Sequence, residues 1–216
     1  NRETIRNVFD DFKPQVVIHA AANKSVDMME YVPSEAISTN VNGTENVLDY
    51  SKIFEVEKFV YISTDKVVNA TSVMGQTKKL GETMTVNSGK GYLAVRFGNV
   101  IGSTGSLIEI WEDQINRGKP ITITDERMAR YFMTIPEAIN LVIQAAELGE
   151  GGEVICFEMG KPVRIRELAE EIIKRLGRDI PMEIIGNRGG EILEERLMTK
   201  EEEERAIHRG KFYIIK

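Results

Sequence analysis

The chain has 216 residues, of which 42% are hydrophobic and 29% are charged, proportions typical of a soluble globular protein. Its net charge of −6 argues against a broad nucleic-acid-binding surface. No apolar run approaches the roughly 20 residues of a membrane helix, and the first residues do not resemble a signal peptide. The single cysteine, Cys156, excludes an internal disulfide bond, and with two histidines the sequence does not support a metal site.

The first segment combines an amphipathic helix with a short apolar strand. We expect the helix over residues 4–12 and a buried strand over residues 16–18. Lys24 follows where an anionic or hydroxylated ligand would lie beyond the strand. Between the strand and Lys24 stand three small residues, which fit either close approach of a ligand or simple helix–sheet packing: Ala20, Ala21 and Ala22.

The next strand leads into a cluster of polar side chains. A long helix is expected over residues 34–54, interrupted near Asn40, and a strand follows over residues 58–62. Ligands bind just beyond the carboxyl ends of strands in open α/β sheets, so this cluster is a candidate site for proton transfer. The alternative is a surface ion pair of little energetic value. The cluster consists of Ser63, Thr64, Asp65 and Lys66.

The order of helices and strands predicts a mainly parallel sheet. A helix is expected from Lys78 to Asn87, and a strand over residues 92–97. The glycine-rich loop 98–106, leading into a helix near 106–117, could cradle an anion but is a weak signal alone. We therefore expect an α/β fold.

The second half contains shorter elements and a second lobe. Thr134 and Glu137 predict a capping box at the start of a helix that runs to Leu148. The segment 125–132 has an exposed, charged pattern, and residues 201–204 are expected to form a solvated helix face. Further elements are expected over residues 121–124 (strand), 154–157 (buried strand), 163–176 (helix closed by Gly177) and 182–185 (strand).

Eight stretches together resemble one protein family, in the family's order and almost from end to end. They are HAAANKSVDMMEYVP, TNVNGTENV, FVYISTDKVVN, VMGQTKKLGE, VRFGNVIGSTGS, RMARYFMTIPEA, MGKPVRIRELA and, more loosely, NRGGEILEE. They resemble the nucleotide-sugar 4,6-dehydratases that act on UDP-N-acetylglucosamine in bacterial polysaccharide synthesis, within the extended short-chain dehydrogenase/reductase superfamily. The combination of STDK, MGxTK and RFGNVxGS is specific, whereas each piece alone is weak.

The resemblance implies a two-part architecture. Residues 1–101 with 131–159 would form part of a Rossmann-like NAD-binding domain with a parallel sheet. Residues 102–130 with 160–216 would form a smaller α/β lobe that binds the nucleotide sugar. NAD is expected rather than NADP, and the expected substrate is a UDP-sugar.

The resemblance also implies roles in an internal redox cycle. Hydride leaves the sugar's 4-position for NAD, water is eliminated across the 5- and 6-positions, and hydride returns at the 6-position. By matching position, Asp65 would protonate the departing hydroxyl and Lys66 would remove the 5-proton. Thr64 would bind the 4-hydroxyl, and Lys78 would hold the nicotinamide ribose.

Met74 stands where the superfamily's Tyr-x-x-x-Lys motif has its tyrosine. A thioether cannot exchange a proton, which disfavours a simple dehydrogenase or a 4-epimerase. Some branches of the UDP-sugar dehydratases carry methionine here, so the acid–base work would fall on Asp65 and Lys66. A lysine acts as a base near neutral pH only if its pKa is depressed, and we expect the charge of Lys78 to depress the pKa of Lys66.

The remaining binding residues are implied by matching position. The cofactor would contact Ala20, Ala21, Ala22, Ser63, Lys78, Phe97 and Gly98. The substrate would contact Lys24, Asn99, Arg130, Arg188 and Glu191, the arginines suiting a diphosphate. The sequence departs from the family at Ser25, at Thr104, and at 188–192, where an RPGEK-like motif lacks its proline and lysine.

The glycine-rich fingerprint of a dinucleotide-binding fold is absent near the start of the chain. We therefore expect an incomplete NAD site, weak NAD binding by this chain alone, little turnover, and an unpaired sheet edge prone to association.

The leading hypothesis is a UDP-N-acetylglucosamine 4,6-dehydratase, a lyase. The alternatives are a nucleotide-sugar 4-epimerase or reductase, and a non-catalytic nucleotide-sugar-binding module. We expect a cytoplasmic homo-oligomer without nucleic-acid or membrane contact from this chain, and leave open whether a parent protein is membrane-anchored.

Overall fold

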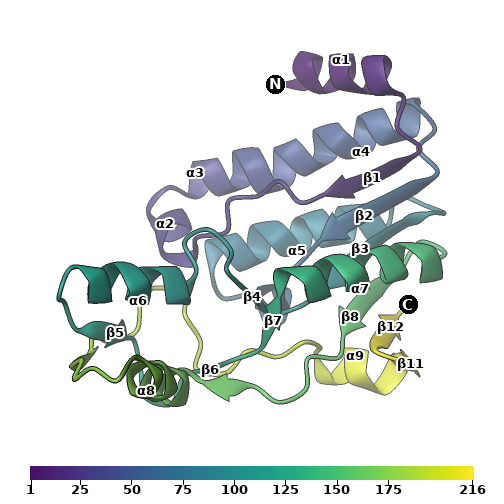
Figure 1. Cartoon of the computed structure of the whole chain (residues 1–216). Coiled ribbons are helices and arrows are strands. Elements are labelled where there is room, and N and C mark those ends of the chain that lie inside the picture. Colours follow the sequence, from purple (N-terminus) through teal and green to yellow (C-terminus); the bar gives the residue numbers. More distant parts are fainter.

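A six-stranded sheet forms the centre of the fold (Figure 1). The computed structural model describes residues 1–216. The strand order is β1-β2-β3-β8-β12-β11; the first four strands are parallel, and β12 and β11 are antiparallel to their neighbours. These strands are β1 (Val16–His19), β2 (Lys58–Ile62), β3 (Tyr92–Arg96), β8 (Val154–Phe157), β11 (Ile207–Arg209) and β12 (Phe212–Ile215).

Helices cover both faces of the sheet, because successive side chains of a strand point to opposite sides. Phe59 and Tyr61 of β2 pack in the cluster that contains Leu48 of α4. Val60, between them, packs against Val142 of α7 on the other face. The covering helices are α4 (Gly43–Ile53), α5 (Val73–Val86) and α7 (Ile135–Leu148).

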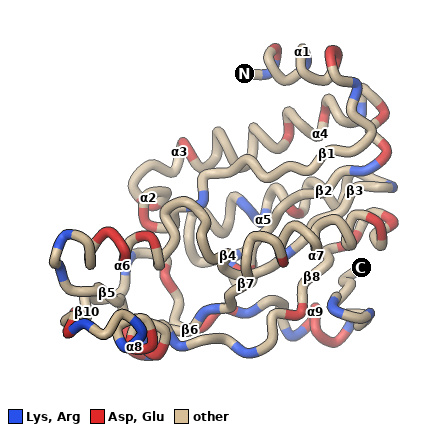
Figure 2. The backbone as a smooth tube through the Cα atoms, in the orientation of Figure 1, with Lys and Arg blue, Asp and Glu red and all other residues tan.

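A smaller lobe packs around Trp111, which is buried with Ile121, Met128 and Ile165. Parallel β5–β10 and antiparallel β6–β9 pairs support it. In Figure 2, charges of both signs lie on α8, where Arg166 pairs with Glu170 one turn away. Its elements are α6 (Leu107–Asn116), β5 (Ile121–Ile123), β6 (Ala129–Arg130), β9 (Val163–Arg164), α8 (Ile165–Leu176) and β10 (Met182–Ile184).

The remaining elements belong neither to the strands and covering helices of the large sheet nor to the smaller lobe. They are α1 (Arg2–Phe12), α2 (Val26–Tyr31), α3 (Pro33–Ala36), the π-helical segment η1 (Ile37–Asn42), the 3₁₀ turn η2 (Asp65–Val67), β4 (Asn99–Ile101), β7 (Phe132–Thr134) and α9 (Lys200–Arg205). None of the helices in the fold is long and apolar enough to cross a membrane.

The helix expected over residues 34–54 contains a π-helical segment at its predicted interruption. Asn40, in this segment, is fully buried. Its side chain accepts a hydrogen bond from Asn23 N (2.7 Å) and donates to Asn23 O (3.0 Å) and Thr77 Oγ1 (3.1 Å). An extra residue in the turn thus aims a polar side chain at the loop after β1, a typical use of π-bulges at functional sites.

Two expectations about burial, one for an edge strand and one for a segment of the lobe, differ from the structure. The strand at 16–18 was expected to be buried, but Val16 and Ile18 are 54% and 49% exposed, because β1 is the edge strand. The segment 125–132 was expected to be exposed, but Met128 and Arg130 are buried in the lobe. Hydrophobic pattern alone does not reveal which strand lies at an edge.

Two helices begin at other residues than the sequence pattern predicts. Helix α5 begins at Val73 rather than Lys78, because the Ser72 side chain accepts a hydrogen bond from Gly75 N and caps it. Helix α8 begins at Ile165, since Val163 and Arg164 pair with β6. The capping box of Thr134 and Glu137 is confirmed.

The C-terminal segment joins the large sheet. The sequence placed residues 160–216 in the smaller lobe, but β11 and β12 form a hairpin that pairs with β8. Helix α9 packs beside this hairpin, and Glu202 in it is buried rather than part of a solvated face. Its partner explains the burial: Glu202 accepts two hydrogen bonds, of 2.8 and 3.1 Å, from Arg96 of β3.

Candidate functional site

Two adjoining cavities lie where β1, β2 and β3 end, as expected for an open α/β sheet. The larger has a volume of about 430 Å³ and the smaller about 210 Å³. The smaller opens towards the second lobe, because Thr122, Met128 and Ile165 line it. The residues that line both cavities are Val26, Lys66, Asn99, Leu107, Arg188 and Glu191. The two cavities thus meet at Lys66.

The larger cavity collects most of the residues expected to bind a cofactor. Ala21 is the exception: it is exposed and lines neither cavity. Lys24 also lines this cavity, with its Nζ 3.2 Å from Ser103 Oγ. The expected cofactor residues in its wall are Ala20, Ala22, Ser63, Lys78, Phe97 and Gly98.

Lys78 presents a buried ammonium group to the larger cavity. Its Nζ donates a hydrogen bond to the carbonyl of Ile62, at 2.5 Å, and lies 4.1 Å from the centre of the Tyr61 ring. Burial lowers the pKa of Lys78 to about 8, only partly opposed by Glu82. Burial and the charge of Lys78 in turn lower the pKa of His19 to about 4. Lys78 therefore loses its proton at a lower pH than an exposed lysine would.

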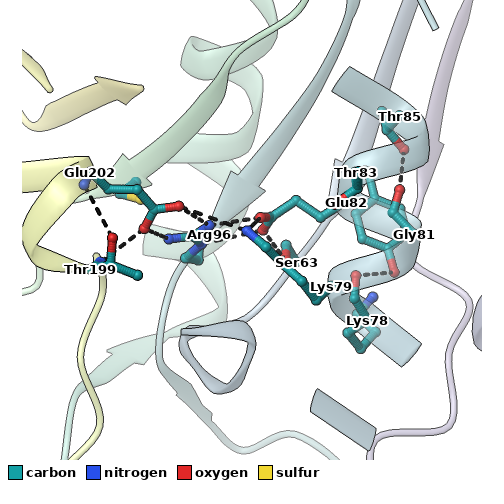
Figure 3. Close-up of polar contacts among 12 residues, drawn as sticks. Ser63, Lys78, Lys79, Gly81, Glu82, Thr83, Thr85, Arg96, Thr199 and Glu202 are labelled. Carbon is teal, nitrogen blue, oxygen red and sulfur yellow. Dashed lines mark hydrogen bonds and ion pairs between the residues drawn. The ribbon is translucent and has the colours of Figure 1, made fainter. Parts of the chain in front are cut away.

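Ser63 belongs to a buried polar network rather than standing alone. Its Oγ donates to Glu82 Oε2 at 2.7 Å, and Glu82 accepts from Arg96 at 2.7 and 3.2 Å. Figure 3 shows Arg96 between Glu82 of α5 and Glu202 of α9. Burial alone would raise the pKa of Glu82, but Arg96 outweighs it and lowers that pKa. The network fixes Ser63 at the wall of the larger cavity.

Phe97 and Gly98 form a flat part of the cavity wall after β3. The Phe97 ring stacks on Phe157 with ring centres 5.1 Å apart. A Cβ at Gly98 would lie 2.7 Å from Tyr131 Cβ and 3.1 Å from Asp65 Oδ2. Glycine is therefore required here, because the backbone approaches the catalytic candidate Asp65 closely.

Thr64, Asp65 and Lys66 are brought together by the tight turn after β2. The Thr64 hydroxyl accepts a hydrogen bond from Lys66 N at 3.4 Å and donates to Asp65 Oδ1 at 3.0 Å. Asp65 is fully buried and lines neither cavity, whereas Thr64 and Lys66 do. Asp65 therefore reaches the cavities only through its two neighbours.

Lys66 lies among hydrogen-bond acceptors and carboxylates. Its Nζ is 3.0 Å from Asp65 Oδ1, 3.0 Å from Asn99 Oδ1 and 3.6 Å from Glu195 Oε1. Burial alone would lower the pKa of Lys66, but Asp65 and Glu195 outweigh it and raise that pKa. The expectation that Lys78 depresses the pKa of Lys66 is therefore wrong, because Lys66 is held in its charged form by these two carboxylates.

Glu195 and Glu82 are site residues that the sequence did not single out. Glu195 lines the smaller cavity, and Glu82 supports Ser63. The loosely matching stretch NRGGEILEE contains Glu195, but nothing in the pattern distinguishes it from the exposed Glu194. Only the packing of the chain reveals which glutamate faces Lys66.

Four of the five expected substrate residues line the smaller cavity, and the fifth, Lys24, lines only the larger one. Arg188 and Glu191 line both cavities, and Asn99 contacts Lys66. Arg130 lines the smaller cavity but is buried, and it donates hydrogen bonds to the carbonyls of Ile192 (2.8 Å), Leu193 (3.2 Å) and Ala129 (2.8 Å). The guanidinium of Arg130 thus anchors the 192–193 segment instead of pointing freely into the cavity.

Met74 faces the larger cavity from α5, one turn before Lys78. It is buried against Met29 and Ala36. The position that could carry a proton-exchanging tyrosine therefore presents an apolar thioether to the cavity.

The wall of the larger cavity fits one end of a dinucleotide. A Cβ-free Gly98, the small side chains of Ala20 and Ala22, and the flat ring of Phe97 allow a planar group to approach the backbone. The Lys78 ammonium could donate to ribose hydroxyls. Residues 1–216 contain no glycine-rich fingerprint for the pyrophosphate.

Known proteins are similar to this chain in sequence and in fold. The family described as "Polysaccharide biosynthesis protein" matches residues 1–216. The capsular polysaccharide biosynthesis protein CapD of Staphylococcus aureus is 50% identical over 210 residues, which are 94% of this chain and 35% of that protein. A UDP-glucose 4-epimerase of Rickettsia canadensis is 38% identical over 207 residues, 92% of this chain and 60% of that protein. The chain thus spans about a third of CapD and less than two thirds of the epimerase.

A solved structure extends the match to three dimensions. The structure of Pen from Bacillus thuringiensis superposes with a TM-score of 0.93 at 34% identity, covering 100% of this chain and 70% of that one. The chain therefore belongs to the family of polysaccharide biosynthesis proteins that comprises nucleotide-sugar dehydratases and epimerases, with a Rossmann-like fold.

Proposed function

We propose that the chain carries the catalytic centre of an NAD-dependent enzyme that dehydrates a UDP-N-acetylhexosamine across its 5- and 6-positions during polysaccharide synthesis. The expected substrate is UDP-N-acetylglucosamine and the product a 4-keto-6-deoxy sugar. The observation that carries this proposal is the position of Lys66, which lines both cavities and pairs with Asp65, while Met74 replaces the proton-exchanging tyrosine.

Elimination of water needs one group that accepts a proton and one that donates a proton. Lys66 Nζ lies at the junction of the cavities and would take the proton from the sugar's 5-position. Asp65 would hold the proton for the departing hydroxyl. Because Asp65 is buried, we infer that this proton passes through the Thr64 hydroxyl, which contacts Asp65 Oδ1 and lines the larger cavity.

NAD in the larger cavity would supply a hydride acceptor and donor. The residues that would hold its nicotinamide end are Lys78, Phe97 and Gly98, with Ala20 and Ala22 beside them. The UDP-sugar would extend from Lys66 into the smaller cavity, where Arg188, Glu191 and Asn99 offer charged and polar groups.

The test is a product assay with the polypeptide in which this chain occurs naturally. Incubation with UDP-N-acetylglucosamine and NAD is expected to yield a 4-keto-6-deoxy sugar, identified by NMR. Lys66→Ala is expected to reduce turnover by at least about a hundredfold, because it removes the proton acceptor. Retained turnover in a folded Lys66→Ala variant would refute the role of Lys66.

A 4-epimerase is the second candidate, because a relative with 38% identity bears that name. It would give a 4-epimer with its 6-hydroxyl intact, which the same NMR assay distinguishes from a dehydrated product. Met74 argues against this candidate, because the cavity then lacks a tyrosine at the position expected to exchange the 4-hydroxyl proton.

A further inference from the structure

The segment 192–195 is held against the catalytic cleft by Arg130 and its neighbour in β6. Arg130 donates hydrogen bonds to the carbonyls of Ile192 and Leu193, and Ala129 N donates to Leu193 O at 2.9 Å. This anchoring brings Glu195, which is only 3% exposed, to the wall of the smaller cavity. A carboxylate so deeply buried needs a charged partner or a proton.

The partners of Glu195 converge on Lys66. Glu195 Oε1 lies 3.6 Å from both Lys66 Nζ and Arg130 Nε, and Oε2 is buried without a hydrogen-bond partner. Asp65, which pairs with the same ammonium group at 3.0 Å, likewise has a buried Oδ2 without a partner. Lys66 therefore pairs with two buried carboxylates, each with one free oxygen.

We propose that Glu195 is a positioning residue for Lys66: its carboxylate, together with that of Asp65, holds the Lys66 ammonium group where the two cavities meet and sets the pH at which Lys66 loses its proton. The inference deepens the proposed function and rests on it, since Lys66 is the proton acceptor there. A structural glutamate with ideal pairing would have both oxygens satisfied, whereas Oε2 remains free beside the cavity.

The physical consequence for catalysis has two sides. A nearby carboxylate favours the charged form of lysine, so Glu195 stabilises the ammonium group that forms when Lys66 accepts a proton. The same interaction reduces the fraction of neutral Lys66 before the reaction. Turnover should therefore rise with pH, and the position of that rise should depend on Glu195.

The charged groups that face the pair come from three places in the fold. Asp65 adjoins Lys66 in the turn after β2, Arg130 comes from β6, and Glu195 follows the anchored segment. Burial raises the pKa of Glu195, with Asp65 adding to the rise and Lys66 and Arg130 opposing it. The cluster contains two cations and two carboxylates. Removing one carboxylate should therefore change the pKa of Lys66 directly.

The experiment measures the pKa of Lys66 from its reactivity. Competitive labelling with acetic anhydride between about pH 7 and pH 11, read by mass spectrometry, gives the fraction of neutral amine at each lysine. In Glu195→Gln the pKa of Lys66 is expected to fall by about one to three units, so labelling at a fixed pH below the pKa rises at least about tenfold. Glu194→Gln is the matched control, because Glu194 carries the same charge but is exposed.

An unchanged Lys66 pKa in folded Glu195→Gln, or an equal fall in Glu194→Gln, would overturn the proposal. If Glu195→Gln does not fold, Glu195→Asp decides, since the shorter carboxylate should lower the Lys66 pKa by a smaller amount. In the active polypeptide, the rise of turnover with pH should move to lower pH in Glu195→Gln; a uniform loss at every pH would indicate a structural role only. Labelling needs no turnover, so a missing dehydratase activity would refute the proposed function separately from the Lys66–Glu195 coupling.

Discussion

At the scale of single residues, the burial of Asp65 decides what its pairing with Lys66 means. An exposed ion pair contributes little to stability, and the sequence left that interpretation open. Asp65 has no exposed surface, its Oδ2 has no partner, and Gly98 approaches it closely. Burying a carboxylate without full pairing lowers the stability of the folded chain, so such a group is kept where its charge or its proton has a function. The surface-pair interpretation is therefore wrong, and the cost is consistent with a functional site.

The close approach of Gly98 predicts a sensitive position. In Gly98→Ala the new methyl would meet Tyr131 Cβ at 2.7 Å and Tyr131 O at 2.9 Å, so the backbone must move. We expect a loss of about 1–3 kcal/mol in the free energy of unfolding, measured by urea unfolding with the fluorescence of the single tryptophan, Trp111.

Gly43→Ala is the control for this substitution. Its new methyl would meet only Ser38 O, at 3.6 Å, in a helical backbone. We expect its stability to be unchanged or to increase by up to about 1 kcal/mol. Equal losses in both variants would contradict the steric explanation.

At the scale of elements, sequence patterns predicted features set by neighbouring residues and missed contacts between residues far apart in the chain. The strand at 58–62 and the capping box at Thr134 follow from short-range rules and were predicted. Arg96 pairs with Glu82 and with Glu202, which is 106 positions away, and no local pattern marks that pair. The same limit applies to Glu195: its neighbour Glu194 has the same chemistry, and only tertiary contacts separate them.

The Arg96 network predicts that Glu202 holds α9 against the sheet and that the neighbouring Glu203 does not. Glu202→Gln removes the buried charge that faces Arg96, and we expect a loss of about 3 kcal/mol in the free energy of unfolding. Glu203→Gln, one residue away and exposed, is expected to change it by less than about 0.5 kcal/mol. Urea unfolding of both variants measures the difference; equal effects would show that the network does not hold α9.

The same network predicts how this stabilisation depends on pH. Burial alone would raise the pKa values of Glu82 and Glu202, but Arg96 outweighs it and lowers both. The pKa values of both glutamates are thus lower in the folded chain than in the unfolded chain, where they are about 4.3. The pairing with Arg96 therefore contributes fully to the free energy of unfolding above that pH, and the contribution is lost as the pH falls through the lower pKa values of the folded chain. The stability difference between the wild-type chain and Glu202→Gln should therefore be constant near neutral pH and shrink in acid. A difference that grows in acid would contradict the pairing.

At the scale of the whole molecule, β1 is one of the two edge strands of the large sheet, with β11 at the opposite edge. β1 pairs only with β2, and its outward side chains Val16 and Ile18 are exposed. Exposed edge strands template pairing with other chains. The sequence predicted an association-prone edge, and the topology places β1 there, although self-association stays a prediction.

We expect this chain to associate as its concentration rises, and Ile18→Lys to weaken that association, because a charged edge resists strand pairing. Sedimentation velocity at several concentrations measures the effect. Ile143→Lys, at a similarly exposed site on α7, is the control and should leave association unchanged. A chain that remains monomeric throughout would contradict the prediction.

The cofactor cavity predicts weak binding by this chain alone. The nicotinamide end has a shaped wall, but residues 1–216 lack a glycine-rich turn for the pyrophosphate. We expect NAD affinity weaker than micromolar in calorimetry with this chain. A Kd of about 1 μM, or about −8 kcal/mol, would require an anion site outside the fingerprint.

The π-helical segment implies that the number of residues in this helix matters as much as their identity. Asn40, inside the segment, reaches the loop after β1, while Thr44, just beyond the segment, contacts His19 Nε2 through its Oγ1 at 3.0 Å. Residues within and just after the segment therefore hold different parts of the chain around the end of β1. Each residue of an α-helix turns the chain by about 100°. Deleting one residue between 37 and 42 would convert the bulge to regular helix and swing one of these contacts away. Relatives that lack one residue between positions 37 and 42 should therefore have a different conformation in the loop after β1. This should hold even where all the flanking residues are the same.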